Sequence, residues 1–404
     1  KLRGSVGKTG SQNLGAYDWR TLMGSATYNG AAGIVPSSLG NDILQWEEQI
    51  QKEVGLDYGF WDDRIRGTLG YYQKKVDNLL YSDPVPTSSS FSSVYQNIGS
   101  LKNRGIEFDV RVDIIKNVQK DLTWNVDFNI ARNRTTLEKL NSSDGYFGGG
   151  AYDYFKIEEG GETGRFYGYK DAGRLFMTNE ELVGLKTIDP KTGTLKYYRD
   201  DYNYERQGDV YIMDLDGDGQ ITADGDRTVI GNANPDFFGG FGSTLYWKGL
   251  MLNAVFSYSV GGDRFWDEEK NSSGDMNVYN TSNRILDSWT VNPGVNASYP
   301  RAMYYGWGSN SIITDRYIHD ASYLRMTALN LSYRLPKHLY KNSILNAVEF
   351  TFQATNLFTW TKYPGMDPQG NFSTTYSAFY NMGIDYSTYP SARTYNFGIK
   401  LTLK

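Results

Sequence analysis

The sequence predicts an all-β protein, a transmembrane antiparallel β-barrel to which this chain contributes about ten strands. Long segments alternate apolar and polar residues with the two-residue period of a strand. These segments run for roughly 10 to 16 residues, whereas a usual strand has about 5 or 6 and a tilted membrane strand needs about 9 to 11. Short turns alternate with long loops, as in outer-membrane barrels. A soluble β-sandwich would also alternate, but it has no reason to keep this parity of connections.

Composition excludes several other classes of protein. The chain has 404 residues and a net charge of −5, which argues against a nucleic-acid binder. It has 33 Tyr, 19 Phe and 44 Gly, which suits a β-rich protein with many turns. There is no Cys, and the only histidines are His319 and His338. We therefore predict no disulfide, no thiolate metal site and no histidine-dependent catalysis, and we expect a protein that is not an enzyme.

The alternation locates the strands along the chain. The segment 121–134 is the clearest example, because its even-numbered residues from Leu122 to Ile130 are all apolar and its odd-numbered ones are polar. No run of about 18 apolar residues exists, so no transmembrane helix is predicted. We place strands at 1–8, 44–60, 64–80, 98–113, 121–134, 236–247, 250–261, 318–335, 345–358 and 392–404.

The connections predict an orientation in the membrane. Short turns are expected at 62–63, 118–120, 247–249 and 336–342, and long loops at 9–43, 81–97, 135–235, 262–317 and 359–391. In barrels of this type the short turns face the periplasm, so the long loops face outside and the C-terminus is periplasmic. Ten strands form only an arc, and the sequence begins inside a strand pattern. We therefore expect further strands upstream to close the barrel.

An acidic, glycine-punctuated loop at 214–226 has the spacing of a calcium loop. Asp214, Asp216 and Asp218 occupy positions 1, 3 and 5 of an EF-hand-like pattern, and Gly219 stands at the sharp turn. Position 12 is Gly225 rather than a carboxylate. The predicted calcium ligands are Asp214, Asp216, Asp218, the Gln220 carbonyl, Thr222 and, if it reaches in through a bulge, Asp226. The alternative interpretation is a solvated acidic turn held by Asx-type hydrogen bonds.

Several separated blocks resemble one known family, the SusC/RagA-type TonB-dependent outer-membrane transporters. They stand in family order over nearly the whole chain. The blocks are Trp46-Glu47 with VGLDYGFWDDRIRGTLGYYQKKVDNLL (54–80), NIGSLKNRGIE (97–107), GETGRFYGYKDAGRLF (161–176), GDVYIMDLDGDGQIT (208–222), DASYLRMTALNLSYRLP (320–336), ATNLFTWTKYPGMDP (354–368) and YPSARTYNFGIKLTLK (389–404). Each block alone is a weak signal, and their joint order is a strong one.

The resemblance implies a barrel of about 22 strands, of which residues 1–404 are the C-terminal part. It implies that the N-terminal strands, a plug domain and a TonB-binding segment lie upstream of this sequence. It implies an address in the outer membrane of a Gram-negative bacterium, surrounded by outer-membrane lipid. The expected partners are a SusD-like surface lipoprotein that covers the barrel as a lid, and the TonB complex. The expected substrate is an oligosaccharide or a peptide, imported with energy passed through TonB.

Aromatic clusters in the long loops are the candidate substrate contacts. Aromatic faces beside polar groups suit sugar rings or peptide side chains. The alternative interpretation is packing within the loops or contact with the lid protein. The candidates are Tyr152, Tyr154 and Phe155; Tyr304, Tyr305 and Trp307; and Phe379 and Tyr380.

Two other functions remain open from the sequence. One is a structural or adhesive outer-membrane barrel that transports nothing, which would lack a plug domain upstream. The other is a secreted carbohydrate-binding β protein, which would be recovered without detergent. The sequence does not distinguish a glycan substrate from a peptide.

Overall fold

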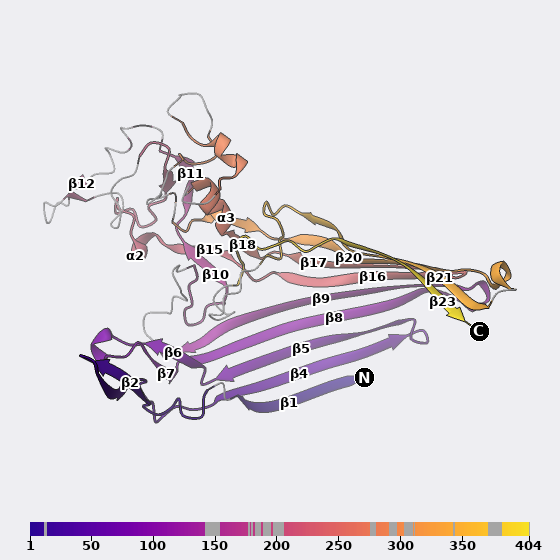
Figure 1. The fold of residues 1–404 in the computed structure, drawn as a ribbon, viewed down its shortest axis with the longest axis horizontal. Helices are drawn as coiled ribbons and strands as arrows, with labels where there is room; N and C mark the ends of the chain where they lie inside the picture. The colour runs from indigo at the N-terminus through magenta and orange to yellow at the C-terminus, as the bar shows by residue number, and fades with distance from the viewer. Residues whose placement is uncertain are drawn as a thin grey trace. The chain divides into compact units, whose positions relative to one another are not determined.

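The computed structural model contains one antiparallel sheet of ten long strands, in the order β1-β4-β5-β8-β9-β16-β17-β20-β21-β23 (Figure 1). The strands are β1 (Leu2–Ser11), β4 (Glu47–Phe60), β5 (Ile65–Asp77), β8 (Gly99–Asn117), β9 (Leu122–Leu140), β16 (Phe237–Trp247), β17 (Leu250–Val260), β20 (Tyr323–Arg334), β21 (Leu345–Thr361) and β23 (Thr394–Leu403). The structure describes residues 1–11, 14–141, 154–176, 178, 181, 187–188, 195–196, 206–274, 280–290, 297–302, 310, 312–341, 344–370 and 382–403. The predicted fold class is confirmed.

Each predicted strand corresponds to one of these ten, with one correction. The segment 318–335 was predicted as a single strand, but it is divided into β19 (Ile318–Asp320) and β20, which belong to different sheets. The break has a local cause. Ser322 donates its backbone N–H to Asp320 Oδ1 at 2.8 Å, and the N–H of Ala321 goes to the carbonyl of Gly262 at 3.0 Å. These bonds form an Asx-type turn that ends the ladder.

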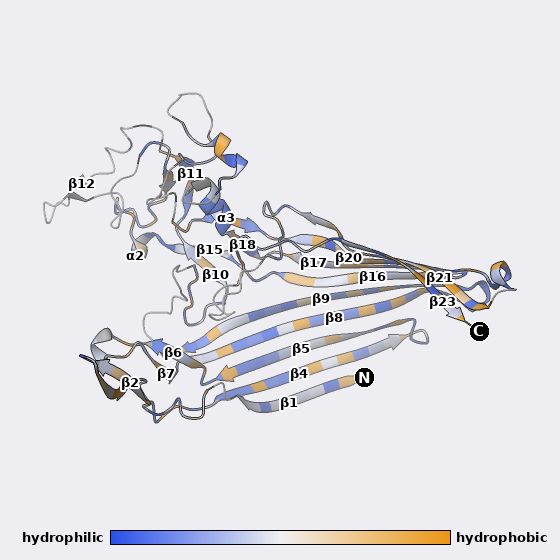
Figure 2. Ribbon diagram, in the orientation of Figure 1, coloured by the Kyte–Doolittle hydropathy of each residue, from blue (hydrophilic) through white to orange (hydrophobic). Residues whose placement is uncertain are grey.

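Residues opposite each other in the sheet share a face, and this register produces one apolar face. Leu56 of β4 pairs with Leu2 on one side and with Leu69 on the other, and Leu69 pairs with Phe108. This face is not covered by protein, since Leu56 is 43% exposed and Val54 is 56% exposed. Figure 2 shows hydrophobic and hydrophilic residues alternating along these strands. Long strands with one exposed apolar face are typical of a sheet solvated by lipid.

The turn between β16 and β17 is a tight hairpin whose backbone demands glycine. Trp247 pairs with Leu250, so Lys248 and Gly249 alone make the turn. Their φ angles are 46° and 86°. Positive φ at both central residues is the type I′ arrangement, whose twist matches that of the flanking strands. The predicted short turn is thus confirmed.

We expect Gly249→Ala to destabilise this hairpin by about 1–2 kcal/mol, because a side chain is strained at positive φ. An added Cβ would also lie 2.8 Å from the carbonyl oxygen of Arg334. Hydrogen exchange of peptides covering β16 and β17 measures the change. Gly70→Ala is the control, since no atom lies within 4 Å of a Cβ at that position. Equal effects of the two substitutions on their own strands would contradict the prediction.

The loops between the long strands carry their own secondary structure. The small strands are β2 (Met23–Tyr28), β3 (Ala31–Pro36), β6 (Leu80–Pro84), β7 (Ser93–Asn97), β10 (Arg165–Gly168), β11 (Asp171–Leu175), β12 (Thr187–Ile188), β13 (Leu195–Lys196), β14 (Val210–Ile212), β15 (Thr228–Asn232), β18 (Asp263–Trp266) and β22 (Ile384–Asp385). The short helices are η1 (Thr87–Ser89), η2 (Val118–Lys120), α2 (Ala223–Asp226), α3 (Asp267–Glu269), η3 (Lys270–Gly274), η4 (Asn283–Asp287), η5 (Asp315–Tyr317) and η6 (Lys337–Tyr340). None of the described helices is long and apolar enough to cross a membrane.

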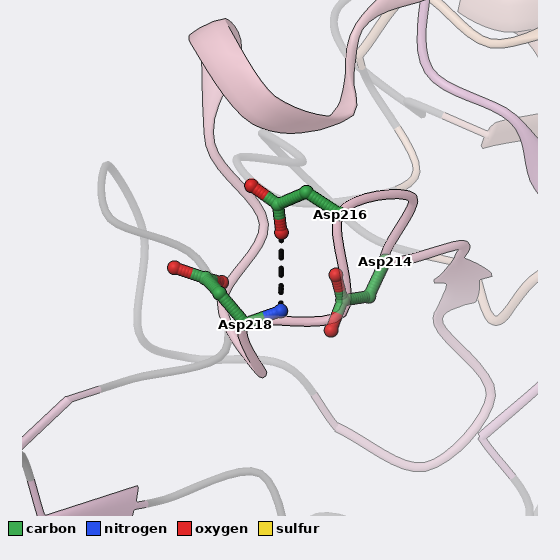
Figure 3. Close-up of side chains that lie close together, drawn as sticks. All are labelled: Asp214, Asp216 and Asp218. Atoms are coloured by element: carbon green, nitrogen blue, oxygen red, sulfur yellow. Dashed lines mark hydrogen bonds between the residues drawn. The ribbon is translucent and has the colours of Figure 1, made fainter.

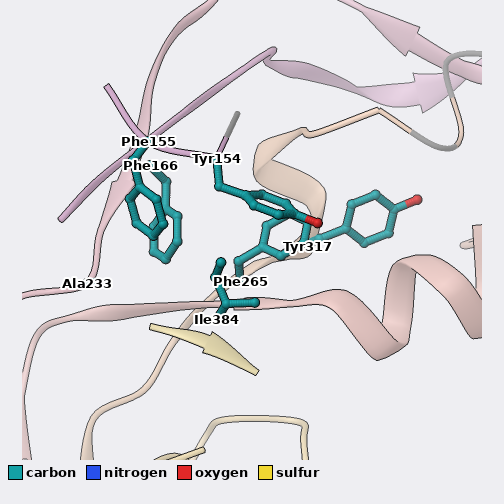
Figure 4. Packing of buried hydrophobic residues seen from close by; sticks show 7 residues of the cluster. All are labelled: Tyr154, Phe155, Phe166, Ala233, Phe265, Tyr317 and Ile384. Atoms are coloured by element: carbon teal, nitrogen blue, oxygen red, sulfur yellow. The ribbon is translucent and has the colours of Figure 1, made fainter. Parts of the chain in front are cut away.

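By their contacts the residues form two compact units. The first comprises Lys1–Lys116, Asn125–Tyr146 and Ile157–Thr163, and the second comprises Asn117–Trp124, Phe147–Lys156 and Gly164–Lys404. The first unit holds the hairpins β2–β3 and β6–β7 beside its long strands. The second unit holds a buried loop core, which we define as Tyr154, Phe155, Phe166, Ala233, Phe265, Tyr317 and Ile384 (Figure 4).

Burial is concentrated in this loop core and not in the long strands. Phe166 and Phe265 are 0% exposed. The rings of Phe155 and Phe166 stack with centroids 5.0 Å apart, and Tyr154 lies against Phe265 at 4.7 Å (Figure 4). Aromatic packing of this kind stabilises beyond the area that it buries. The long loops are therefore a folded body and not a set of independent connections.

Candidate functional site

The acidic loop brings three of its six predicted ligands together. The carboxylate oxygens of Asp214, Asp216 and Asp218 offer atoms that all lie within 4.8 Å of one another (Figure 3). Asp214 accepts the N–H groups of Gly217 at 2.7 Å and Gly219 at 2.8 Å. Both glycines have positive φ, 76° and 82°, which lets the chain curl around the carboxylates. Clustered carboxylate oxygens are the donors that a hard cation such as calcium prefers.

The other predicted ligands close the loop instead of joining this cluster. Asp226 is 0% exposed, and its two oxygens accept the N–H groups of Leu215 and Thr222, each at 2.7 Å. The Thr222 hydroxyl caps helix α2 by accepting the Gly225 N–H at 2.9 Å. The N–H of Gln220 donates to Asp218 Oδ1 at 2.8 Å. The Asx-type turns of the alternative interpretation are thus present, and calcium binding stays a prediction.

We expect millimolar calcium to slow hydrogen exchange in residues 208–227 about tenfold, because a ligand that binds only the folded loop stabilises it at concentrations above its Kd. Asp216→Asn should remove the effect. Asp224→Asn is the control, since Asp224 is an exposed carboxylate outside the cluster. Loss of the calcium effect in both variants, or its absence from the unmodified protein, would refute the prediction.

Of the predicted aromatic contacts, two lie in the described part of the chain. Tyr154 is 5% and Phe155 is 3% exposed, and both belong to the loop core. The hydroxyl of Tyr154 donates to Asp267 at 2.9 Å. For these two residues the structure shows packing within the loops, and neither offers an open ring face to a ligand. Tyr152, Tyr304, Tyr305, Trp307, Phe379 and Tyr380 lie outside the described residues.

A buried carboxylate beside the loop core joins three segments. Glu269 of α3, 5% exposed, accepts hydrogen bonds from Arg284 Nη1 at 2.7 Å and from the Tyr299 hydroxyl at 3.2 Å. His319 Nε2 lies 2.5 Å from its other oxygen. Burial first, and the charge of Glu269 second, raise the pKa of Tyr299, so its hydroxyl stays protonated. The cluster stabilises loop packing, and no sequence signal predicted it.

A second buried ion pair attaches the loop after β21 to strand β20. Arg325 is 4% and Asp367 is 6% exposed, and Nη2 of the arginine contacts Oδ1 of the aspartate at 2.5 Å. Arg325 Nη1 also donates to the side chain of Gln369 at 2.6 Å. Asp367 Oδ2 in turn accepts the N–H of Ser391 at 3.1 Å. One guanidinium therefore orders residues on both sides of the segment 371–381.

A third buried group, Asp209, performs the same task for another loop. Asp209 is 1% exposed and accepts Arg301 Nε at 2.6 Å and Arg301 Nη2 at 3.2 Å. The amide of Asn310 donates to Asp209 Oδ1 at 2.9 Å, and its own oxygen accepts the N–H of Val210 at 2.8 Å. Asp209 thus holds the chain immediately before and after the segment 303–309, which carries predicted aromatic contacts. Its partners are about a hundred residues away, so spacing alone did not reveal them.

The first unit contains a cavity of about 390 Å³ that the sequence did not predict. Its walls combine hydroxyl groups with one carboxylate and two aromatic rings. We call it the serine-lined cavity. The lining residues are Asp18, Leu22, Pro36, Ser37, Ser38, Leu39, Ser90, Phe91, Ser92, Ser93, Val94 and Tyr95. Many hydroxyls beside an aromatic face suit a ligand that itself carries hydroxyl groups.

Ten long antiparallel strands with an exposed apolar face and folded loops define a β-barrel protein of the outer-membrane type. The family model for the TonB dependent receptor-like β-barrel matches residues 1–357. The chain therefore belongs to the TonB-dependent receptor family, as the resemblance of its sequence blocks predicted. Membership of this family places the barrel in the outer membrane.

Curated relatives agree with this assignment. The chain is 32% identical to TonB-dependent receptor P3 of Formosa agariphila, over 99% of this chain and 39% of that protein. It is 28% identical to TonB-dependent receptor SusC of Bacteroides thetaiotaomicron, over 99% of this chain and 37% of the relative. The chain thus spans about two fifths of the length of the relatives it matches.

Solved structures give the same result for the fold. The structure of the RagAB peptide transporter matches with a TM-score of 0.74 at 26% identity, over 99% of this chain and 40% of that chain. The open-open state of the RagAB peptide importer matches with a TM-score of 0.73 at 28% identity, over 100% of this chain and 40% of that one.

Proposed function

We propose that residues 1–404 form the C-terminal barrel part of an outer-membrane importer for oligosaccharides or peptides, energised through TonB. The observation that carries the proposal is the similarity of nearly the whole chain, block by block and strand by strand, to SusC and to the RagAB transporter. A plug domain, a TonB-binding segment and a SusD-like lipoprotein lid complete the proposed machine. The chain itself supplies wall and loops, and no catalysis.

The proposed orientation has the short turns and the C-terminus in the periplasm. The hairpin at Lys248 and Gly249 supports it, because two-residue turns are typical of the periplasmic rim. The long connections, with the loop core and the buried carboxylates that order them, then face the outside, where a substrate arrives. Loops built on a rigid core suit recognition, since a pre-ordered surface loses little entropy on binding.

The serine-lined cavity favours an oligosaccharide over a peptide. Ser90 and Ser92 are exposed in its wall, and Tyr95 is 37% exposed beside them. Asp18 adds a carboxylate, one of whose oxygens accepts the N–H of Gly15 at 2.8 Å. Hydroxyls and a carboxylate exchange hydrogen bonds with sugar hydroxyls, while a tyrosine ring packs on the apolar face of a pyranose.

Uptake by intact cells tests the importer. Fluorescent oligosaccharides and peptides are offered to cells that express the full-length protein, with and without functional TonB and with and without the SusD-like partner. TonB-dependent accumulation of one substrate class supports the proposal. Unchanged uptake after deletion of the gene, together with altered cell adhesion, would favour the structural barrel instead. Recovery of the full-length protein in the soluble fraction without detergent would favour a secreted binding protein.

Substitutions in the cavity separate recognition from transport. We expect Tyr95→Ala to raise the KM for oligosaccharide uptake about fivefold with little change in kcat, because a stacking contact worth about 1 kcal/mol is lost in every bound state. Tyr389→Ala is the control, since Tyr389 is 94% exposed and does not line the cavity. Equal KM values for the two variants would exclude the cavity from substrate binding.

A further inference from the structure

The apolar face of the first unit ends in a row of cations at its loop-side edge. Along β4 this face reads Phe60, Tyr58, Leu56 and Val54, and the next residue on it is Lys52. Along β8 it runs from Ile114 to Ile106 and then reaches Arg104. Successive residues of one parity point to one face of a strand, so both cations point the same way as the apolar residues beneath them.

The register aligns these positions across neighbouring strands. Lys52 pairs with Gln73 of β5, and Gln73 pairs with Arg104. Two strand spacings of about 4.8 Å place the Cα atoms of Lys52 and Arg104 roughly 10 Å apart. On β9, which neighbours β8, Arg132 follows the apolar residues Phe128 and Ile130 with the same parity. We call Lys52, Arg104 and Arg132 the basic belt.

The basic belt has no counter-charge of its own. All three side chains are exposed, and within the described ranges none of them makes a hydrogen bond or an ion pair. The residues one step further from the apolar face behave differently. There Lys8 pairs with Glu48 at 2.9 Å, Lys75 with Asp77 at 2.9 Å, and Lys102 with Glu138 at 3.0 Å. The sheet therefore neutralises one row of cations internally and leaves the row at the apolar boundary free.

From this placement we infer that the basic belt binds the phosphate groups of phosphorylated glycolipid in the leaflet on the loop side of the membrane. Cationic side chains at the edge of an apolar band extend to the headgroup level, where anions lie. Each such cation near an anionic surface strengthens binding appreciably. Two arginines add forked donors that match phosphate oxygens. The Gln73 amide between two cations offers a further N–H donor.

Lipid retention by the full-length protein tests the inference. The protein is reconstituted in nanodiscs of neutral phospholipid with a graded fraction of phosphorylated lipid A, and native mass spectrometry counts the lipid A that stays bound. The variant K52Q/R104Q/R132Q should retain it with roughly 10- to 100-fold lower apparent affinity. The control R64Q/K116Q/K120Q removes the same charge from the turn side of these strands and should retain it as the unmodified protein does.

Several results would overturn the inference. They are equal loss in the control variant, equal retention of enzymatically dephosphorylated lipid A, and displacement of the lipid by millimolar inorganic phosphate, which would identify a free-phosphate site instead. Resistance of the folded barrel to SDS at low temperature verifies that each variant folds. The inference rests on the proposed orientation but not on transport. TonB-dependent uptake without lipid retention refutes the basic belt alone, and lipid retention without uptake refutes the proposed importer alone.

Discussion

Phe265→Ala is expected to lower the free energy of opening of the loop core by about 3–5 kcal/mol, the usual cost of truncating a buried phenylalanine. Phe265 is 0% exposed and lies against Tyr154, Phe166 and Tyr317, with ring centroids 4.7, 6.5 and 6.2 Å away. The cavity would remain partly empty, because the surrounding rings belong to separate segments that are anchored independently. The lost packing adds to the lost burial.

Hydrogen exchange in the full-length protein measures this effect locally. Peptides covering β10, β15 and β18 should exchange faster, while peptides from β4 and β5 should keep their rates, because local opening need not involve the whole protein. Leu286→Ala is the control, since Leu286 is 81% exposed and its loss should change the opening free energy by less than about 0.5 kcal/mol. Equal exchange in both variants would show that the loop core does not stabilise the loops.

Arg325→Met is expected to destabilise the loop after β21 by about 3–5 kcal/mol, because it leaves the buried carboxylate of Asp367 without its counter-charge. The two side chains are only 5% and 7% exposed, so solvent screens the pair little. The double variant R325M/D367L should be less destabilised than R325M, since it removes both buried charges together. A double-mutant cycle on exchange rates in residues 362–370 gives the coupling energy. Additive effects would show that the contact is not energetically coupled.

The same pair predicts a pH dependence. Burial raises the pKa of Asp367, but hydrogen bonds from the Gln369 and Ser391 N–H groups and the Arg325 guanidinium outweigh it, so the net pKa is lowered. A lowered folded-state pKa means that the ionised group stabilises the loop fully above the ordinary carboxyl pKa of about 4. That contribution is lost as pH falls from about 4 through the lowered pKa. Exchange corrected for intrinsic rates should show this loss, and Asp367→Asn should remove the dependence.

The strands were predictable because their signal is local. In β9 the apolar residues from Leu122 to Ile130 alternate with polar ones, and the structure places a strand at Leu122–Leu140. Tight turns were predictable for a similar reason, because Gly249 follows directly after an aromatic strand end. The break at Ala321 was missed, since the Gly262 carbonyl that accepts its N–H is distant in sequence.

The candidate site was predictable only in part. The spacing of Asp214, Asp216 and Asp218 correctly predicted that their carboxylates gather, because a short loop with glycines brings neighbours together. The part of Asp226 was different from that expected, since its oxygens satisfy buried N–H groups of the loop. Loop aromatics such as Tyr154 attracted attention as ligand contacts, whereas composition alone cannot distinguish a ring that stacks on a ligand from one that is buried.

By itself the sequence determined the number, length and outward face of the strands in the described sheet, and the family. Each strand meets lipid on one face, so its pattern needs no knowledge of its neighbours. Only the tertiary structure decided what orders the loops. Glu269 meets Arg284 and His319 across 15 and 50 residues, and Asp209 meets Asn310 across 101. Such pairs leave no periodic trace in the sequence, because their energies depend on burial and geometry that exist only once the chain has folded.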